Sequence, residues 1–393
     1  MERFLVKSNP LTSFDNLFTT AERLLAMILL DQCSERSKEV ENMKIACVIA
    51  IALLVGVVAS AQTNSYTAAP IVNNTQDPFL VNPWGLSRPA KSSSSDNEWW
   101  ASDNATGYTT LYYADKSGAQ SLAGLVITVP SANGTGKGSP TGTAYNAAVG
   151  PGPGADNFAF ATLDGTISNW NAGARPNPVG TGCYKCHVTT TTIMVNHSGL
   201  GASYTGLTEA INASTKAPTY YAANNKGGVE AYDAASFTTV TLSGKFSDPR
   251  IPSSYKAYGI QTVGPKIWVT YFNGASGGYV DAFDTNGNLK MRLAQGSLEE
   301  PWGLAMAPAN FGAFSSMLLV ANTTSGTIAA FNPATGVFQG FLNDSTGSPI
   351  IIPGIWAISF GDGNKVSGPT NTLYYTAGGN SYATGVFGAI TAN

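Results

Sequence analysis

The sequence predicts an all-β protein, a six-bladed β-propeller, because one strand pattern recurs six times along the chain. Each unit has a first strand that begins around a Gly, a second apolar strand that ends in a polar residue or Gly, and a third strand after a Gly turn. Successive first-strand glycines lie 44 to 64 residues apart, close to the length of one four-stranded blade. The glycines are Gly85, Gly142, Gly206, Gly259, Gly303 and Gly354.

The clearest copy of the unit spans residues 301–332, and the others can be aligned to it. Small residues alternate with large apolar ones in these segments, as in half-buried strands. Glycine suits the innermost strand, since a side chain there would crowd the neighbouring blade. The predicted blades cover residues 81–130, 139–198, 203–246, 254–296, 300–345 and 352–393.

The fourth, outer strands are less regular. We expect them at residues 125–130, 237–246, 289–294 and 337–342. The last unit runs out after its third strand, and residues 66–73 can supply its outer strand. Pairing of the N- and C-terminal strands would close the ring and remove an exposed sheet edge.

Composition favours an exported globular protein. Of 393 residues, 43% are hydrophobic and only 11% are charged, with 43 Gly and 21 Pro. The formal net charge is −3, and −2 without residues 1–61. Such a balance offers no basic surface for nucleic acid, so we expect no nucleic-acid partner.

The N-terminal region predicts export. Lys44 precedes an apolar run at residues 45–58, and Ala59, Ser60 and Ala61 follow it, as in a secretory signal peptide. We expect cleavage after Ala61, with residues 43–61 as the signal and residues 1–42 as a misassigned start or a disordered extension. The run is shorter than the roughly 20 residues of a bilayer-spanning helix. The mature chain is therefore expected to have no stable membrane span and to be secreted or periplasmic.

Several longer motifs stand out along the chain, namely NPWGL (82–86), WASDNATG (100–107), FATLDGTISNWN (160–171), FSDPRIPSSY (246–255), EPWGLAMAPANFG (300–312), LYYTAGG (373–379) and GVFGAI (385–390). Together they resemble an uncharacterised family of secreted bacterial proteins related to NHL-type β-propellers. The resemblance covers nearly all of residues 66–393 and implies a propeller fold and export. Some members carry a PEP-type C-terminal sorting tail, which we do not expect here because none precedes Asn393. The family implies no established activity.

The sequence CYKCH at residues 183–187 is the clearest departure from the repeat. Cys183 and Cys186 could bond covalently to haem while His187 ligates the iron, with Met194 or His197 as the second axial ligand. A disulfide between Cys183 and Cys186 in a surface loop is the simpler alternative. A zinc site that includes His187 and His197 is a third. The sequence leaves these three alternatives open.

Polar residues at the second-strand ends predict a cation site at the mouth of the central channel. Carboxylate and amide oxygens suit calcium, and a divalent cation there could polarise a substrate carbonyl, as in propeller lactonases. The alternative is that Asn and Asp serve the tight turns between strands. The candidate ligands are Asp103, Asn104, Asp164, Asn224 and Asn322, with Asn225 and Asn273 at related positions.

Two classes of function follow from these observations. The first is a binding scaffold that uses one face of the propeller for a protein, glycan or small-molecule ligand. The second is an enzyme or redox protein, either a metal-dependent lactonase-like hydrolase or a c-type haem electron carrier. The recurrent tryptophans are expected to pack between blades before serving as a ligand platform. They are Trp84, Trp100, Trp268, Trp302 and Trp356.

Overall fold

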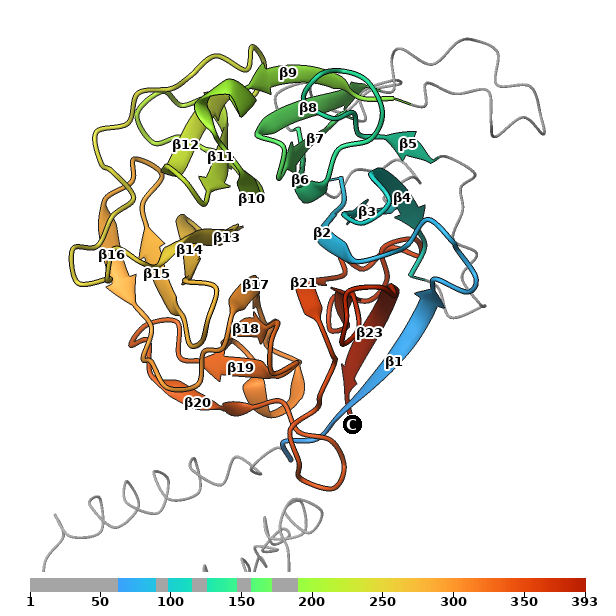
Figure 1. The fold of residues 1–393 in the computed structure, drawn as a ribbon. Coiled ribbons are helices and arrows are strands. Elements are labelled where there is room, and N and C mark those ends of the chain that lie inside the picture. The colour runs from blue at the N-terminus through green and yellow to red at the C-terminus, as the bar shows by residue number, and fades with distance from the viewer. Residues whose placement is uncertain (1–62, 90–97, 115–125, 147–156, 172–189) are drawn as a thin grey trace, which may run out of the picture. The chain divides into compact units, whose positions relative to one another are not determined.

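A computed structural model describes residues 63–89, 98–114, 126–146, 157–171 and 190–393. Within the compact unit Thr63–Asn393, six antiparallel sheets follow one another around a central axis (Figure 1). The prediction of an all-β, six-bladed propeller is confirmed. No helix in the described ranges has the length and apolar character needed to cross a bilayer.

The two inner strands of each blade pair in the order in which the chain forms them. The first strands are β2 (Pro83–Ser87), β6 (Pro140–Tyr145), β10 (Tyr204–Ile211), β13 (Lys256–Val263), β17 (Pro301–Met306) and β21 (Ile355–Phe360). The second strands are β3 (Trp99–Asp103), β7 (Asn157–Thr162), β11 (Pro218–Asn224), β14 (Lys266–Phe272), β18 (Leu318–Asn322) and β22 (Leu373–Ala377). Each second strand ends beside the start of its first strand. We call this end of the propeller, where the second strands turn into the third, the turn face.

The outer strands complete the sheets. The third strands are β4 (Tyr108–Tyr112), β8 (Thr166–Asn171), β12 (Gly228–Asp233), β15 (Tyr279–Phe283), β19 (Ile328–Phe331) and β23 (Val386–Ala392). The fourth strands are β5 (Ile127–Thr128), β9 (Thr192–Asn196), β16 (Leu289–Arg292), β20 (Phe338–Phe341) and β1 (Tyr66–Asn73). In the described part of the chain, the connections contain two short 3-10 helices, η5 (Ser198–Leu200) and η6 (Gly312–Phe314).

Closure of the ring by the two ends of the chain is also confirmed. Strand β1 pairs antiparallel with β23, from Tyr66 opposite Ala392 to Asn73 opposite Val386 (Figure 1, blue beside red). The buried Tyr66 hydroxyl donates a hydrogen bond to the Phe311 carbonyl at 3.0 Å and accepts one from the Phe314 amide at 3.0 Å. The N-terminal strand is thereby tied to blade 5 as well as to blade 6.

The hydrophobic core lies in layers between neighbouring blades. Trp100 packs with Phe158 and Trp170 between blades 1 and 2, with its ring centroid 4.1 Å from that of Phe158. Trp268 packs between blades 4 and 5. These two tryptophans therefore have the structural role that the repeat predicts.

The first-strand glycines let the inner strands approach one another backbone to backbone. A Cβ added to Gly142 would lie 2.1 Å from the Leu207 amide nitrogen of the next blade. At Gly85 the closest atom would be the Thr141 carbonyl oxygen at 2.4 Å, and at Gly303 the Trp356 carbonyl oxygen at 2.2 Å. Real Cβ atoms essentially never come this close to backbone atoms, so these positions exclude any larger residue.

The prediction that Gly354 is the first-strand glycine of blade 6 is wrong. Ile355 pairs with Ala377 in the register in which Pro301 pairs with Asn322, so the residue equivalent to Gly303 is Ala357. Gly354 instead precedes the strand, with φ of 63°. The sequence motif was misleading because Gly occurs at the two positions for different reasons. In the other blades it permits close packing of the first strands, and at Gly354 it permits a left-handed turn.

The predicted outer strand of blade 3 at residues 237–246 is also wrong, since this blade has three strands. Only an isolated bridge joins Thr239 to Tyr232. Phe237 and Phe246 have φ of 59° and 47°, which interrupts an extended conformation. The segment then turns to blade 4, where the Phe246 amide donates to the Gly287 carbonyl at 3.0 Å.

Replacing Gly142 with Ala should destabilise the fold, because the new methyl group would overlap the backbone of blade 3. We expect Gly142→Ala to lower the free energy of unfolding by about 3 kcal/mol, as for overpacked cores. Gly199→Ala is the matched control, since a Cβ at Gly199 meets no atom within 4 Å. Chemical denaturation measures both variants, and equal stability of the two would contradict the predicted close approach.

Candidate functional site

Aromatic side chains from opposite sides of the ring meet in the central channel. The Trp84 ring stacks on Trp356 with centroids 3.8 Å apart, and it lies 6.2 Å from Trp302. Tyr258 of blade 4 lies 6.0 Å from Trp84 of blade 1. Leu163 of blade 2 packs against the same group. These side chains span the channel, so Trp84, Trp302 and Trp356 pack between blades as expected and also contact one another across the ring.

Hydrogen bonds fix two of the channel tryptophans. The Trp302 indole donates to the Thr205 carbonyl of blade 3 at 3.0 Å. The Trp356 indole donates to the side-chain oxygen of Asn82 at 2.9 Å. The channel is therefore closed by rings that are held in place from several blades.

The predicted cation ligands lie at the turn face, but each makes its hydrogen bonds within its own blade or with a neighbouring one. Asp103 is fully buried and accepts a hydrogen bond from Thr110 at 2.8 Å. Burial raises the pKa of Asp103 well above its usual value, and the nearby Asp77 raises it further. Asp103 therefore belongs to the interior of blade 1 and is a poor calcium ligand.

The remaining predicted ligands serve the turns. Asn104 donates to the Pro140 carbonyl at 3.1 Å, and Asp164 accepts from the Ser139 amide at 2.7 Å. Asn224 accepts from the Ser203 amide at 3.1 Å. Asn322 accepts from the Glu299 amide at 3.1 Å. Turn chemistry accounts for these contacts, and joint binding of a cation by the five residues stays a prediction.

A pocket of about 530 Å³ opens on the turn face between blades 1 and 2. Phe79, Tyr108 and Lys137 are among the residues that line it. The Lys137 ammonium lies 4.0 Å from the centroid of the Tyr108 ring, a cation–π contact. Phe79 meets the same ring edge-on at 5.0 Å. The pocket thus combines aromatic surface with one positive charge.

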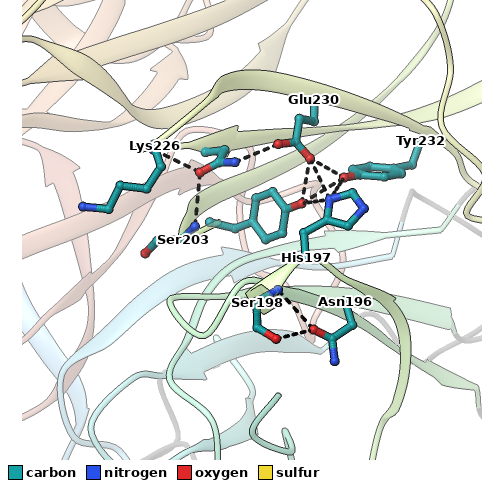
Figure 2. Close-up of polar contacts among 9 residues, drawn as sticks. Asn196, His197, Ser198, Ser203, Lys226, Glu230 and Tyr232 are labelled. Carbon is teal, nitrogen blue, oxygen red and sulfur yellow. Dashed lines mark hydrogen bonds and ion pairs between the residues drawn. The ribbon is translucent and has the colours of Figure 1, made fainter. Parts of the chain in front are cut away.

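A dense polar cluster lies between blades 2 and 3 (Figure 2). It consists of His197, Tyr204, Glu230 and Tyr232, which we call the blade-3 cluster. His197 follows β9, Tyr204 begins β10, and Glu230 and Tyr232 lie two residues apart on β12, so their side chains share one face of the strand. The cluster unites residues from two blades.

Four polar atoms of the blade-3 cluster contact one another. The Tyr204 hydroxyl lies 2.7 Å from Glu230 Oε2 and 2.9 Å from the Tyr232 hydroxyl. His197 Nδ1 lies 3.0 Å from Tyr204, 3.2 Å from Tyr232 and 3.3 Å from Glu230. The Tyr232 hydroxyl also donates to Glu230 Oε2. Imidazole, carboxylate and two phenols therefore converge on one point.

Electrostatics within the cluster favour a charged carboxylate and neutral phenols. Burial raises the pKa of Glu230, but its hydrogen bonds outweigh burial and lower the pKa below the ordinary value. One of these bonds comes from Asn224 at 2.7 Å to Oε1. Burial and hydrogen bonding raise the pKa of Tyr204 and Tyr232 above the ordinary value of tyrosine. The His197 and Glu230 side chains are 32% and 28% exposed, so solvent reaches the cluster from their side.

Sequence reasoning missed Tyr204, Glu230 and Tyr232. One signal was present, since Tyr204 begins its first strand where blades 1, 2 and 5 have Pro83, Pro140 and Pro301. Another was the acidic Glu230 inside a strand of a chain with few charges. Their meeting with His197 depends on strand register between blades, which the local pattern does not reveal.

The haem, zinc and disulfide hypotheses fall largely outside the described residues, because Cys183, Cys186 and His187 do so. The two further ligands proposed for them are described. Met194 on β9 is 43% exposed, and His197 directs Nδ1 into the blade-3 cluster. These hypotheses stay predictions.

Comparison with known proteins finds uncharacterised relatives. No family model matches the chain. It is 27% identical over 297 residues to the uncharacterised protein R648 of Acanthamoeba polyphaga mimivirus, covering 71% of this chain and 68% of that protein. It is 28% identical over 296 residues to the uncharacterised protein L690 of the same virus, covering 71% and 73%. These relatives are viral, so the predicted bacterial family stays a prediction.

Solved structures with a similar chain course include an enzyme and a WD40 β-propeller domain. A luciferin-regenerating enzyme aligns with 11% identity and a TM-score of 0.47, covering 83% of this chain and 95% of that chain. The WD40 β-propeller domain of Doa1 aligns with 10% identity and a TM-score of 0.45, covering 83% and 96%. Likeness at this level carries nothing about activity.

Neutralising Glu230 should change how stability depends on pH. Because its folded-state pKa is lowered, its charge stabilises the fold above the unfolded pKa of about 4.3, and this contribution is lost as the pH falls through the folded pKa. The stability difference between wild type and Glu230→Gln should therefore shrink as the pH falls from about 5 to about 3. Denaturation at each pH measures it, and a constant difference would contradict the predicted ionisation.

Proposed function

We propose that the protein is an exported binding scaffold that engages its ligand through the turn face. The observation that carries this proposal is the closure of the central channel by Trp84, Tyr258, Trp302 and Trp356. A ligand therefore meets the ends of the channel and the blade junctions. The pocket and the blade-3 cluster both lie at junctions on the turn-face side.

The pocket between blades 1 and 2 is suited to a small polar ligand or the end of a glycan. Its volume of about 530 Å³ lies within the range of small-molecule sites, roughly 300–1,000 Å³. Tyr108 and Phe79 offer aromatic surface. Lys137 offers the one ammonium group among the lining residues, which favours a ligand that carries a negative charge.

The mouth of the channel offers a second contact region. Glu300 accepts hydrogen bonds from Tyr258 at 2.8 Å and from Thr324 at 2.6 Å. Tyr382 packs on Trp356 with centroids 5.6 Å apart and is only partly buried. This part of the face presents aromatic and acidic groups together, so the turn face is not uniform in charge.

The alternatives have less support. A lactonase-like hydrolase would use Asp103, Asn104, Asp164, Asn224 and Asn322 at the channel mouth, and these side chains already serve turns and the interior of a blade. A haem carrier would depend on Cys183, Cys186 and His187.

Export by a signal ending at Ala61, to the periplasm or the medium, is supported by the apolar run at residues 45–58. The sequence resemblance to secreted NHL-like bacterial proteins favours the same destination.

A photoreactive amino acid placed at Lys137 should form covalent adducts in the medium or periplasm of producing cells, since a bound ligand would contact it. The matched control is the same amino acid at Ile211, which is 54% exposed at the opposite end of β10. Adding Tyr108→Ala should remove the adduct at position 137. Equal labelling at both positions, or at position 211 only, would refute a turn-face scaffold.

Processing of the N-terminus is tested separately. In cells with a general secretory pathway, the exported chain should begin at Gln62, because signal peptidases need small residues before the cut. Mass spectrometry of the purified protein gives its first residue. Ala61→Arg should make the precursor accumulate, and an exported protein that retains residues 1–61 would show the assignment to be wrong.

A further inference from the structure

The packing of the blade-3 cluster is tighter than its protons explain. Six close contacts join four atoms, His197 Nδ1, the two phenol oxygens and Glu230 Oε2. An ionised carboxylate only accepts, each phenol has one proton, and Nδ1 has at most one. These groups supply at most three protons between them, so at most three of the six contacts can be hydrogen bonds with a separate proton. A cation at the centre would satisfy all four atoms at once.

The separations are close to those of metal ligands. Five of the contacts measure 2.7 to 3.3 Å. Ligand atoms about 2.0–2.2 Å from a tetrahedrally bound metal lie roughly 3.3–3.6 Å from one another. An outward movement of a few tenths of an ångström would open the cluster for an ion. The exposed edges of His197 and Glu230 provide the route of entry.

We propose that the blade-3 cluster binds a hard trivalent metal ion, ferric iron, through His197 Nδ1, Glu230 Oε2 and the oxygens of Tyr204 and Tyr232. Carboxylate and phenolate oxygens are hard ligands, imidazole suits iron, and tyrosine is a known iron ligand. One carboxylate and two phenolates supply three negative charges, which match the charge of the ferric ion. A divalent ion would leave the partly buried site with an excess negative charge.

Binding would be coupled to proton release. The ferric ion displaces one proton from each phenol to solvent and forms a bond to each oxygen, while His197 keeps its proton on Nε2. No electron is transferred. Because protons compete with the metal, affinity should fall as the pH falls. The neighbouring Asn224, which donates to Glu230 Oε1 at 2.7 Å, holds the carboxylate in position.

The described residues contain no other cluster of acidic side chains that could bind a metal. Among the described residues, no group of three or more His, Cys, Asp and Glu side chains is placed to hold a metal. The blade-3 cluster has one His and one Glu, and tyrosines complete its ligand set. In blade 1, Thr110 and Tyr112 occupy the positions equivalent to Glu230 and Tyr232, and they are fully buried. Blade 3 differs by its added imidazole, its acid and its access to solvent.

The test is a titration of the full chain with ferric nitrilotriacetate at neutral pH. Cys33→Ser, Cys47→Ser, Cys183→Ser and Cys186→Ser are included in every sample, so that thiol ligands play no part. We expect a visible phenolate-to-iron charge-transfer band that saturates at one equivalent, and acidification of a weakly buffered solution. Gallium(III) should compete for the site, and zinc(II) should bind more weakly. Absence of the band, or tighter binding of zinc, would overturn the proposal.

Variants assign the site. Tyr204→Phe and Tyr232→Phe should each weaken ferric binding by more than about 100-fold, the upper range for loss of an outer partner. Tyr220→Phe is the matched control, since Tyr220 lies in the same blade and its buried hydroxyl has no hydrogen-bond partner in the described part of the chain. Glu230→Gln and His197→Gln, with circular dichroism as a check of folding, cover the case in which a phenylalanine variant fails to fold. A band that persists in all four variants would place the iron elsewhere.

Discussion

The close approach of the innermost strands governs the rest of this propeller. Gly85, Gly142 and Gly303 lie where a side chain would overlap the backbone of the next blade, so the first strands pack against one another without side chains between them. The residue before this position directs its side chain into the channel, and in three blades that residue is a tryptophan. Trp84 and Trp302 precede a glycine, and Trp356 precedes Ala357. The channel is narrow and is closed by large aromatic side chains. Any binding or catalytic site must therefore lie at the ends of the strands or at the junctions between blades.

One junction departs from the repeat in a way that packing does not require. Most blades have apolar or hydroxyl side chains where blade 3 has Glu230, and three blades begin their first strand with Pro where blade 3 has Tyr204. His197 arrives from the preceding connection to complete the group. In blade 1 the equivalent positions have a purely structural role, since Asp103, Thr110 and Tyr112 are fully buried. A fold that places the same side-chain positions at every junction allows one junction to bind a metal while the others only pack.

Periodic features of the fold could be predicted from the sequence, and features that depend on register could not. Alternating apolar residues, the Gly turns and the unpaired end of the last unit predicted the strands and the pairing of β1 with β23. The Gly354 assignment failed because one glycine resembles another without knowledge of strand pairing. Asp103 and Asn322 were placed correctly at strand ends, but burial and turn hydrogen bonds decide what such residues do. In the blade-3 cluster, His197 contacts Glu230 and Tyr232, which lie 33 and 35 positions later in the sequence, so no local sequence motif predicts the cluster.

The measurement that tests the central claim most directly is an anomalous difference map at the iron absorption edge, from crystals soaked in ferric nitrilotriacetate. The map separates three places where a metal could bind, namely the blade-3 cluster, the mouth of the channel and the CYKCH sequence. We expect one strong peak within bonding distance of His197 Nδ1 and Glu230 Oε2. A peak over the strand ends at Asp164 and Asn322, a peak at the cysteines, or no peak at all would contradict it.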